Sequence, residues 1–113
     1  MHEASLAKSI LEIAEEYSGK FNGKRVKNIK LRVGELVGIY PDALLQYFTE
    51  FSRGTRAEGA ELVFENVPVK GKCRECKEEF VLNNFEFNCP KCNESKFDVI
   101  GGDEFELTNL EIE

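Results

Sequence analysis

The chain is 113 residues long, which suffices for one small domain or two very small lobes and leaves little room for a large catalytic cleft. It carries 21 acidic against 15 basic side chains, and the resulting net charge of −6 disfavours nucleic acid and anionic membranes as partners. Neither a signal-peptide-like run after Met1 nor an apolar stretch of about 18 residues is present. We therefore expect a cytoplasmic protein without a transmembrane span.

The first third of the chain predicts a helix followed by a strand. Apolar side chains recur at helical spacing, at Leu6, Ile10, Ile13 and Tyr17. This spacing predicts a helix over roughly residues 4–18 that ends at Gly19. In the next segment, "VKNIKLRVGEL", apolar residues alternate with Lys30 and Arg32. A period of two predicts a strand with one buried face and one solvated face.

The remaining segments predict a second helix and two further strands. The stretch "YPDALLQYFTEFSRG" places Pro41 at a first helical position and offers Gly54 as a terminator. The stretch "AELVFENVPV" is rich in strand formers and ends at Pro68, and the C-terminal "DEFELTNLEIE" alternates apolar and polar residues. Between these two strands, the core pattern gives way to charged turns, asparagines and cysteines.

Four cysteines in that intervening stretch, Cys73, Cys76, Cys89 and Cys92, form two Cys-x2-Cys pairs. Two residues between thiolates let one tight turn present both sulfurs to one ion, and two such turns complete a tetrahedron. We expect a structural Zn²⁺ here, because protein thiolates fill all four positions. Iron in a rubredoxin-like site remains an alternative, and disulfides rank third in a reducing cytosol.

Each cysteine pair is followed by a residue that zinc knuckles often hold in the left-handed conformation. Asn93, after the second pair, tolerates that conformation, whereas Lys77, after the first pair, is less suited to it. A lobe of this size buries little core, so we expect the metal to supply much of its folding free energy.

These elements define an α+β fold, with two helices on a small three-stranded sheet and an inserted zinc-ribbon lobe. We expect the α+β domain to comprise residues 1–69 plus 98–113, because the last strand should return to the first sheet. The inserted domain comprises residues 70–97.

The inserted lobe does not have the charge of a nucleic-acid-binding module. Residues 70–97 carry six basic and five acidic side chains, and four thiolates with one dication add two negative charges. We interpret its aromatic residues as the small core beneath the metal rather than as platforms for bases. They are Phe80, Phe85, Phe87 and Phe97.

The single histidine, His2, lies one residue from the α-amine of Met1. The amine, the backbone amide nitrogen of His2 and its imidazole can close consecutive chelate rings in one plane, a donor set that suits Ni²⁺ or Cu²⁺. The fourth donor would be the amide nitrogen or carboxylate of Glu3, or a partner's ligand. We expect Met1 to be retained because a bulky second residue blocks its removal. The alternative is an exposed terminal histidine without a role.

Several segments together resemble the HypA family of hydrogenase-maturation nickel chaperones. They are "MHEASLAKSI", "VGELVGIYPDAL", "GTRAEGAELVFENVP", "CREC", "CPKC" and "GGDEFELTNLEIE". The resemblance covers essentially the whole chain. It implies delivery of Ni²⁺ to the large subunit of [NiFe] hydrogenase, together with the nickel-handling GTPase HypB, and service to urease in some members.

The resemblance also implies roles for individual residues. His2 is the nickel ligand, with Met1 and Glu3 contributing nearby donors, and the four cysteines hold structural zinc. Family members commonly have glycine where Asn93 stands, and some have further histidines near the zinc lobe. The lone histidine here argues against a nickel site that needs two imidazoles, but not against a site at the N-terminus.

We expect no catalysed reaction, because no second histidine or available thiol nucleophile completes an acid–base constellation. Two rival functions remain open. A zinc-ribbon adaptor would bind only the cysteine metal and dock a partner, whereas a rubredoxin-like electron carrier would be red and redox active. The sequence leaves open whether hydrogenase or urease receives the nickel, and whether the chain forms a homodimer.

Overall fold

The computed structural model describes residues 2–82 and 88–113, and these form two compact units. The first unit lies within Met1–Arg32, Gly38–Glu65 and Glu106–Glu113, and the second within Val33–Val37 and Asn66–Phe105. The second unit holds the described residues of the expected insertion, 70–82 and 88–97, together with flanking segments. No helix within the described part of the chain is long and apolar enough to cross a membrane.

The first unit contains the two helices that the sequence predicts, α1 (Glu3–Lys20) and α2 (Pro41–Phe51), and they pack against each other. Helix α1 runs through Gly19, so the prediction that it ends there is wrong. The stop comes later, where Asn22 and Gly23 both adopt a positive φ. Pro41 opens α2 as expected, because its fixed φ suits the first turn.

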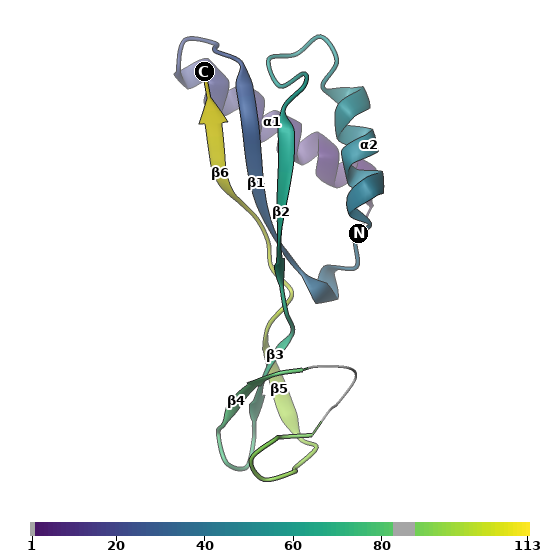
Figure 1. Ribbon diagram of the computed structural model, residues 1–113, viewed down its shortest axis with the longest axis vertical. Coiled ribbons are helices and arrows are strands. Elements are labelled where there is room, and N and C mark those ends of the chain that lie inside the picture. The colour runs from purple at the N-terminus through teal and green to yellow at the C-terminus, as the bar shows by residue number, and fades with distance from the viewer. Residues whose placement is uncertain (1, 83–87) are drawn as a thin grey trace. The chain divides into compact units, whose positions relative to one another are not determined.

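A three-stranded sheet accompanies the helices, in the order β2-β1-β6, formed by β1 (Val26–Gly34), β2 (Glu61–Val67) and β6 (Phe105–Ile112) (Figure 1). Strand β2 runs parallel to β1, and β6 runs antiparallel to it (Figure 1). A short 3-10 helix, η1 (Glu35–Val37), follows β1. The expected return of the C-terminal strand to the first sheet is therefore observed.

Buried apolar side chains from both helices and the sheet form the core of the first unit. They include Ala7, Ile10, Ala14, Val26, Ile29, Leu31, Leu44 and Phe48. The buried stripe of α1 differs from the predicted one, because Ile13 and Tyr17 are 45% and 43% exposed. Small residues occupy the buried positions instead, which lets α1 approach its neighbours closely.

The basic side of β1 faces acidic side chains of the neighbouring strands. Arg32 lies 3.6 Å from a carboxylate oxygen of Glu65 on β2 and 3.8 Å from one of Glu106 on β6. These partners neutralise the arginine locally, which supports the interpretation of this face as a solvated surface rather than a phosphate-binding one.

The second unit contains its own antiparallel sheet, in the order β4-β3-β5. Its strands are β3 (Lys70–Cys73), β4 (Glu79–Val81) and β5 (Phe97–Gly101). Strand β3 ends at the first cysteine and pairs with both neighbours, so Cys73 lies opposite Phe97. This sheet fixes the backbone of Cys73 and both ends of the turn that carries Cys76.

Candidate metal sites

The two Cys-x2-Cys pairs adopt the same turn. In the first, the N–H of Cys73 donates to the oxygen of Glu78 at 2.8 Å, and the N–H of Lys77 donates to the oxygen of Cys73 at 3.1 Å. In the second, Cys89 donates to Glu94 and Asn93 donates to Cys89, both at 2.8 Å. Two equivalent hydrogen-bonded turns therefore present two sulfurs each.

Both turns require a left-handed residue after the second cysteine. Asn93 has φ 62°, as its side chain permits, and Lys77 has φ 65°. The turn therefore holds Lys77, the less suited of the two residues, in the same left-handed conformation as Asn93. The Nζ of Lys77 also donates to the carbonyl of Arg74 at 3.1 Å, within the same turn.

The four sulfur atoms form a cluster of the size that a thiolate-bound metal needs. All lie within 4.8 Å of one another, with Cys73 Sγ 3.5 Å from Cys92 Sγ and Cys76 Sγ 3.6 Å from Cys89 Sγ. A tetrahedral Zn–S bond of about 2.3 Å implies sulfur separations of about 3.8 Å. A disulfide would need about 2.05 Å, so the cysteines are free and the donor set fits a metal.

The protein lowers the cost of ionising one of these thiols. The backbone N–H of Cys76 donates to the sulfur of Cys73, and this contact lowers the pKa of Cys73 to about 7. At Cys92 the backbone N–H of Glu94 also favours the thiolate, but the neighbouring thiol of Cys73 and burial outweigh it and raise the pKa to about 12. Cys73 is therefore the thiol best prepared to meet a cation.

A small apolar core lies against the cluster, as the aromatic content of the lobe predicts. Phe80 is 8% exposed and meets Phe97 edge to face, with ring centroids 5.6 Å apart. The predicted core residues Phe85 and Phe87 lie outside the described residues. The sequence reasoning missed Gly71, where an added Cβ would lie 2.9 Å from the Phe97 ring. A glycine inside a strand, two residues before the first cysteine, could have indicated this close contact from the sequence.

Three basic side chains of the lobe, Lys70, Arg74 and Lys91, lie within ion-pair distance of carboxylates. Arg74 donates to one carboxylate oxygen of Asp98 through Nε at 2.9 Å and Nη2 at 2.8 Å. Lys70 lies 3.0 Å from Glu79, and the pKa of that carboxyl is lowered by its hydrogen bond with Lys70. Paired basic side chains do not form a phosphate-binding stripe.

The second predicted site lies at the start of α1. His2 occupies the N-cap position with extended backbone angles, φ −88° and ψ 129°, and its exposed imidazole makes no capping hydrogen bond. Its carbonyl accepts from the N–H of Leu6 at 3.1 Å, which anchors the residue to the helix. Glu3 is the first helical residue and is half-buried. Met1, the other predicted donor, lies outside the described residues.

The helix start leaves backbone nitrogens available near the imidazole. The first N–H groups of a helix have no carbonyl partner within it, so those of His2 and Glu3 are not used by helical bonding. The positive end of the helix dipole also favours an anionic amide nitrogen at this place. The described geometry thus combines an exposed imidazole with two adjacent amides.

The fold and the cysteine cluster define a small α+β protein with a four-thiol metal centre, and comparisons with known proteins identify its family. Residues 1–112 match the family model described as "Hydrogenase/urease nickel incorporation, metallochaperone, hypA". The chain is 42% identical over 113 residues to the hydrogenase maturation factor HypA of Desulfitobacterium hafniense, covering 100% of this chain and 99% of that one. It is 39% identical to the HypA of Geotalea uraniireducens, with 100% of both chains covered.

Solved structures agree on the fold. The solution structure of the Ni metallochaperone HypA from Helicobacter pylori gives a TM-score of 0.67 at 23% identity, over 99% of this chain and 97% of that one. A second structure, titled "Solution structure of HypA protein", gives 0.75 at 24% identity, over 99% and 96%. This chain belongs to the HypA family of nickel metallochaperones, a family of metal carriers rather than enzymes.

Proposed function

We propose that this chain binds Ni²⁺ at its N-terminus through His2, with donors from Met1 and Glu3, and delivers the ion in the maturation of [NiFe] hydrogenase. The observation that carries the proposal is the exposed imidazole of His2, fixed at the N-cap of α1 beside amide nitrogens that the helix does not use. Amine, amide and imidazole nitrogens together match the planar preference of Ni²⁺.

Zinc is the metal that we propose for the cysteine cluster, held by Cys73, Cys76, Cys89 and Cys92. Its role is structural, because the cluster offers four protein ligands and the turns around it hold the strands of the second unit together. We propose further that residues 70–97 form a domain that gains much of its folding free energy from this metal, inserted into an α+β domain of residues 1–69 and 98–113.

Ligand exchange gives the transfer mechanism. The terminal nitrogens capture Ni²⁺, and a docked partner supplies or withdraws the remaining ligands, so the ion passes on without a reaction at this chain. We propose the GTPase HypB as a partner in loading and the large subunit of [NiFe] hydrogenase as the recipient, within the cytoplasm. Service to urease is the alternative route.

A calorimetric Ni²⁺ titration of the zinc-loaded, untagged chain tests the site. We compare the wild type with His2→Ala and with a chain extended by one residue before Met1, which moves the amine away. Binding to one site should disappear in both variants while the zinc content stays unchanged. Identical titrations in all three proteins would contradict the proposal and favour a zinc-ribbon adaptor.

Acidification gives a second arm of the same titration. Protons compete with Ni²⁺ for imidazole and amine nitrogens, so binding should be clearly weaker at about pH 6 than at about pH 7.5. Equal affinity at the two pH values would argue against these ligands.

A further inference from the structure

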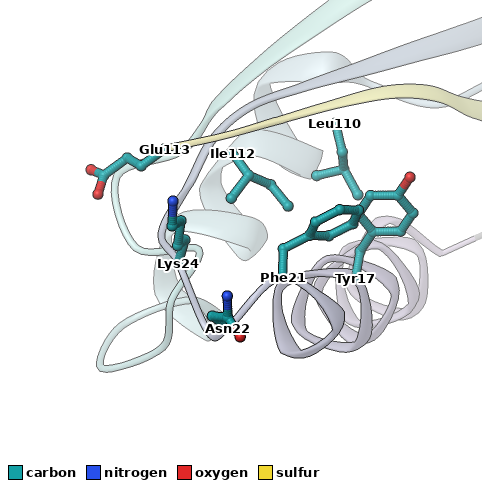
Figure 2. Close-up of a pocket in the computed structure, with 7 residues that line it drawn as sticks. All are labelled: Tyr17, Phe21, Asn22, Lys24, Leu110, Ile112 and Glu113. Atoms are coloured by element: carbon teal, nitrogen blue, oxygen red, sulfur yellow. The ribbon is translucent and has the colours of Figure 1, made fainter.

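A groove lined by apolar side chains lies between α1 and β6 in the first unit. Its apolar lining comes from three residues of or just after the helix and three of the strand: Ile13, Tyr17, Phe21, Leu107, Leu110 and Ile112. Figure 2 shows the rings of Tyr17 and Phe21 beside each other, facing Leu110 and Ile112. The centroids of these two rings lie 5.2 Å apart. The side chains of Tyr17 and Phe21 are 43% and 49% exposed, whereas the neighbouring Ala14 and Ser18 are buried.

The strand that borders this groove is an edge strand. Within the part of the chain that the structure describes, β6 pairs only with β1, so its outer side carries unpaired backbone N–H and C=O groups. An additional strand could bond to these groups and place every second side chain on the groove. The groove and the open edge are therefore parts of one surface.

The charge of this surface favours a basic occupant. From Glu106 to its end the chain carries three acidic and no basic side chains: Glu106, which pairs with Arg32, Glu111 and Glu113. Glu113 also lines the groove, where Lys24 is the one cation among the described lining residues. Opposite charges across paired strands stabilise the pair, so an incoming strand with lysine or arginine fits this edge.

A second copy of this chain fits the edge poorly. If two copies of β6 paired along their full length in antiparallel fashion, residue 105 would face residue 112 and Glu106 would face Glu111. Like charges directly opposite each other destabilise a strand pair. In this full-length register the acidic side chains disfavour self-pairing and favour a basic strand.

We propose that β6 and the α1–β6 groove bind an extended segment of a partner protein in which lysine or arginine alternates with apolar side chains. The segment adds as a fourth strand beside β6, with its apolar side chains against Tyr17, Phe21 and Leu110. This docking surface does not depend on nickel binding and goes beyond the metal sites.

A blocked peptide of alternating lysine and valine is the probe, and a peptide of alternating glutamate and valine is its control. Both are titrated into isotope-labelled, zinc-loaded full-length chain, with backbone amide shifts read by NMR. The lysine peptide should shift the amides of β6 and of Ile13, Tyr17 and Phe21. It should bind at least about tenfold more tightly than the glutamate peptide at low salt.

The chain offers a matched pair of variants. Tyr17 and Phe21 resemble Tyr47 and Phe51 of α2, which are also four residues apart and exposed, with ring centroids at 5.9 Å and the same 34° tilt. The double variant Tyr17→Ser, Phe21→Ser should abolish peptide binding, whereas Tyr47→Ser, Phe51→Ser should keep it. Glu111→Lys should weaken the lysine peptide and strengthen the glutamate peptide.

Several results would overturn the proposal. They are an absence of shifts at millimolar lysine peptide, equal binding of the two peptides, and equal loss of binding in both double variants. A wild-type dimer that Tyr17→Ser, Phe21→Ser converts to monomer would also overturn it, because the occupant would then be a second copy.

Discussion

Lys77 and Asn93 occupy the same position in the two cysteine turns, and both adopt left-handed backbone, with φ 65° and 62°. Local preference predicts this conformation for Asn93 but not for Lys77. At Lys77 the turn imposes it, since the N–H must reach the oxygen of Cys73. A single residue's preference is thus a weak guide where two cysteines fix the turn around it.

Lys77→Gly should therefore stabilise the second unit by about 1 kcal/mol, because glycine adopts a positive φ without the steric cost that a lysine bears. The measurement is zinc retention in competition with a chelator, together with thermal unfolding. Glu75→Gly is the control, since Glu75 is exposed in the same turn and has no positive φ. That change should weaken retention. A loss of zinc from Lys77→Gly that equals the loss from Glu75→Gly would contradict the argument.

The ionisation of Cys73 predicts how zinc binding depends on pH. Its pKa of about 7 lies below the ordinary value of 9.0, so the thiolate forms as the pH rises through 7 and is lost as the pH falls through it. Zinc displaces the remaining thiol protons. Zinc affinity should therefore rise with pH, and the protons released per zinc should fall by about one between about pH 6 and about pH 8.

Calorimetry in buffers of different ionisation enthalpy counts these protons. A count that stays constant over this range would contradict the assignment, because it would mean that no thiol of the metal-free chain titrates near neutrality.

At the scale of elements, the sequence predicts both helices, the sheet and its C-terminal strand, but it misplaces the buried face of α1. Hydrophobicity selects the large residues Ile13 and Tyr17, whereas the structure buries Ala7, Ala14 and Ser18 around Ile10. Close packing of α1 against its neighbours requires small side chains at the contact. A prediction from hydrophobicity alone does not select alanine and serine for such positions. The large residues displaced from the core become the wall of the α1–β6 groove.

Gly34, the last residue of β1, is required by close backbone packing. An added Cβ would lie 2.1 Å from the carbonyl oxygen of Gly102 and 2.8 Å from the amide nitrogen of Asp103. Neither backbone atom can move away cheaply, so Gly34→Ala should destabilise the protein by about 3 kcal/mol or more.

Gly19→Ala is the matched control for this substitution. Its added Cβ would meet nothing nearer than the Arg56 guanidinium at 3.8 Å, and alanine favours a helix, so stability should rise by up to about 1 kcal/mol. Denaturant unfolding of the zinc-loaded protein measures both. Equal stability of the two variants would contradict the prediction, because it would show that the backbone at Gly102 and Asp103 moves to accommodate the added Cβ.

At the scale of the whole molecule, the sequence predicts two metal sites on different physical grounds. The cysteine site follows from a spacing whose geometry is local, because each turn needs only six residues to present two sulfurs. The N-terminal nickel site stays a prediction from donor chemistry and family resemblance, since an exposed terminal histidine leaves no trace in packing or periodicity. The α1–β6 groove could not be predicted from the sequence, because it depends on which face of α1 packs inward.

The central claim is that one small chain keeps two kinds of metal apart, nitrogen ligands for Ni²⁺ at the start of α1 and sulfur ligands for Zn²⁺ in the second unit. The measurement that tests it most directly is a nickel-edge X-ray absorption spectrum of the zinc-loaded, untagged chain with one equivalent of Ni²⁺. We predict nitrogen or oxygen donors only, in a planar arrangement, with imidazole scattering that His2→Ala removes. Sulfur scattering around nickel would contradict the account, because it would place the ion among the cysteines.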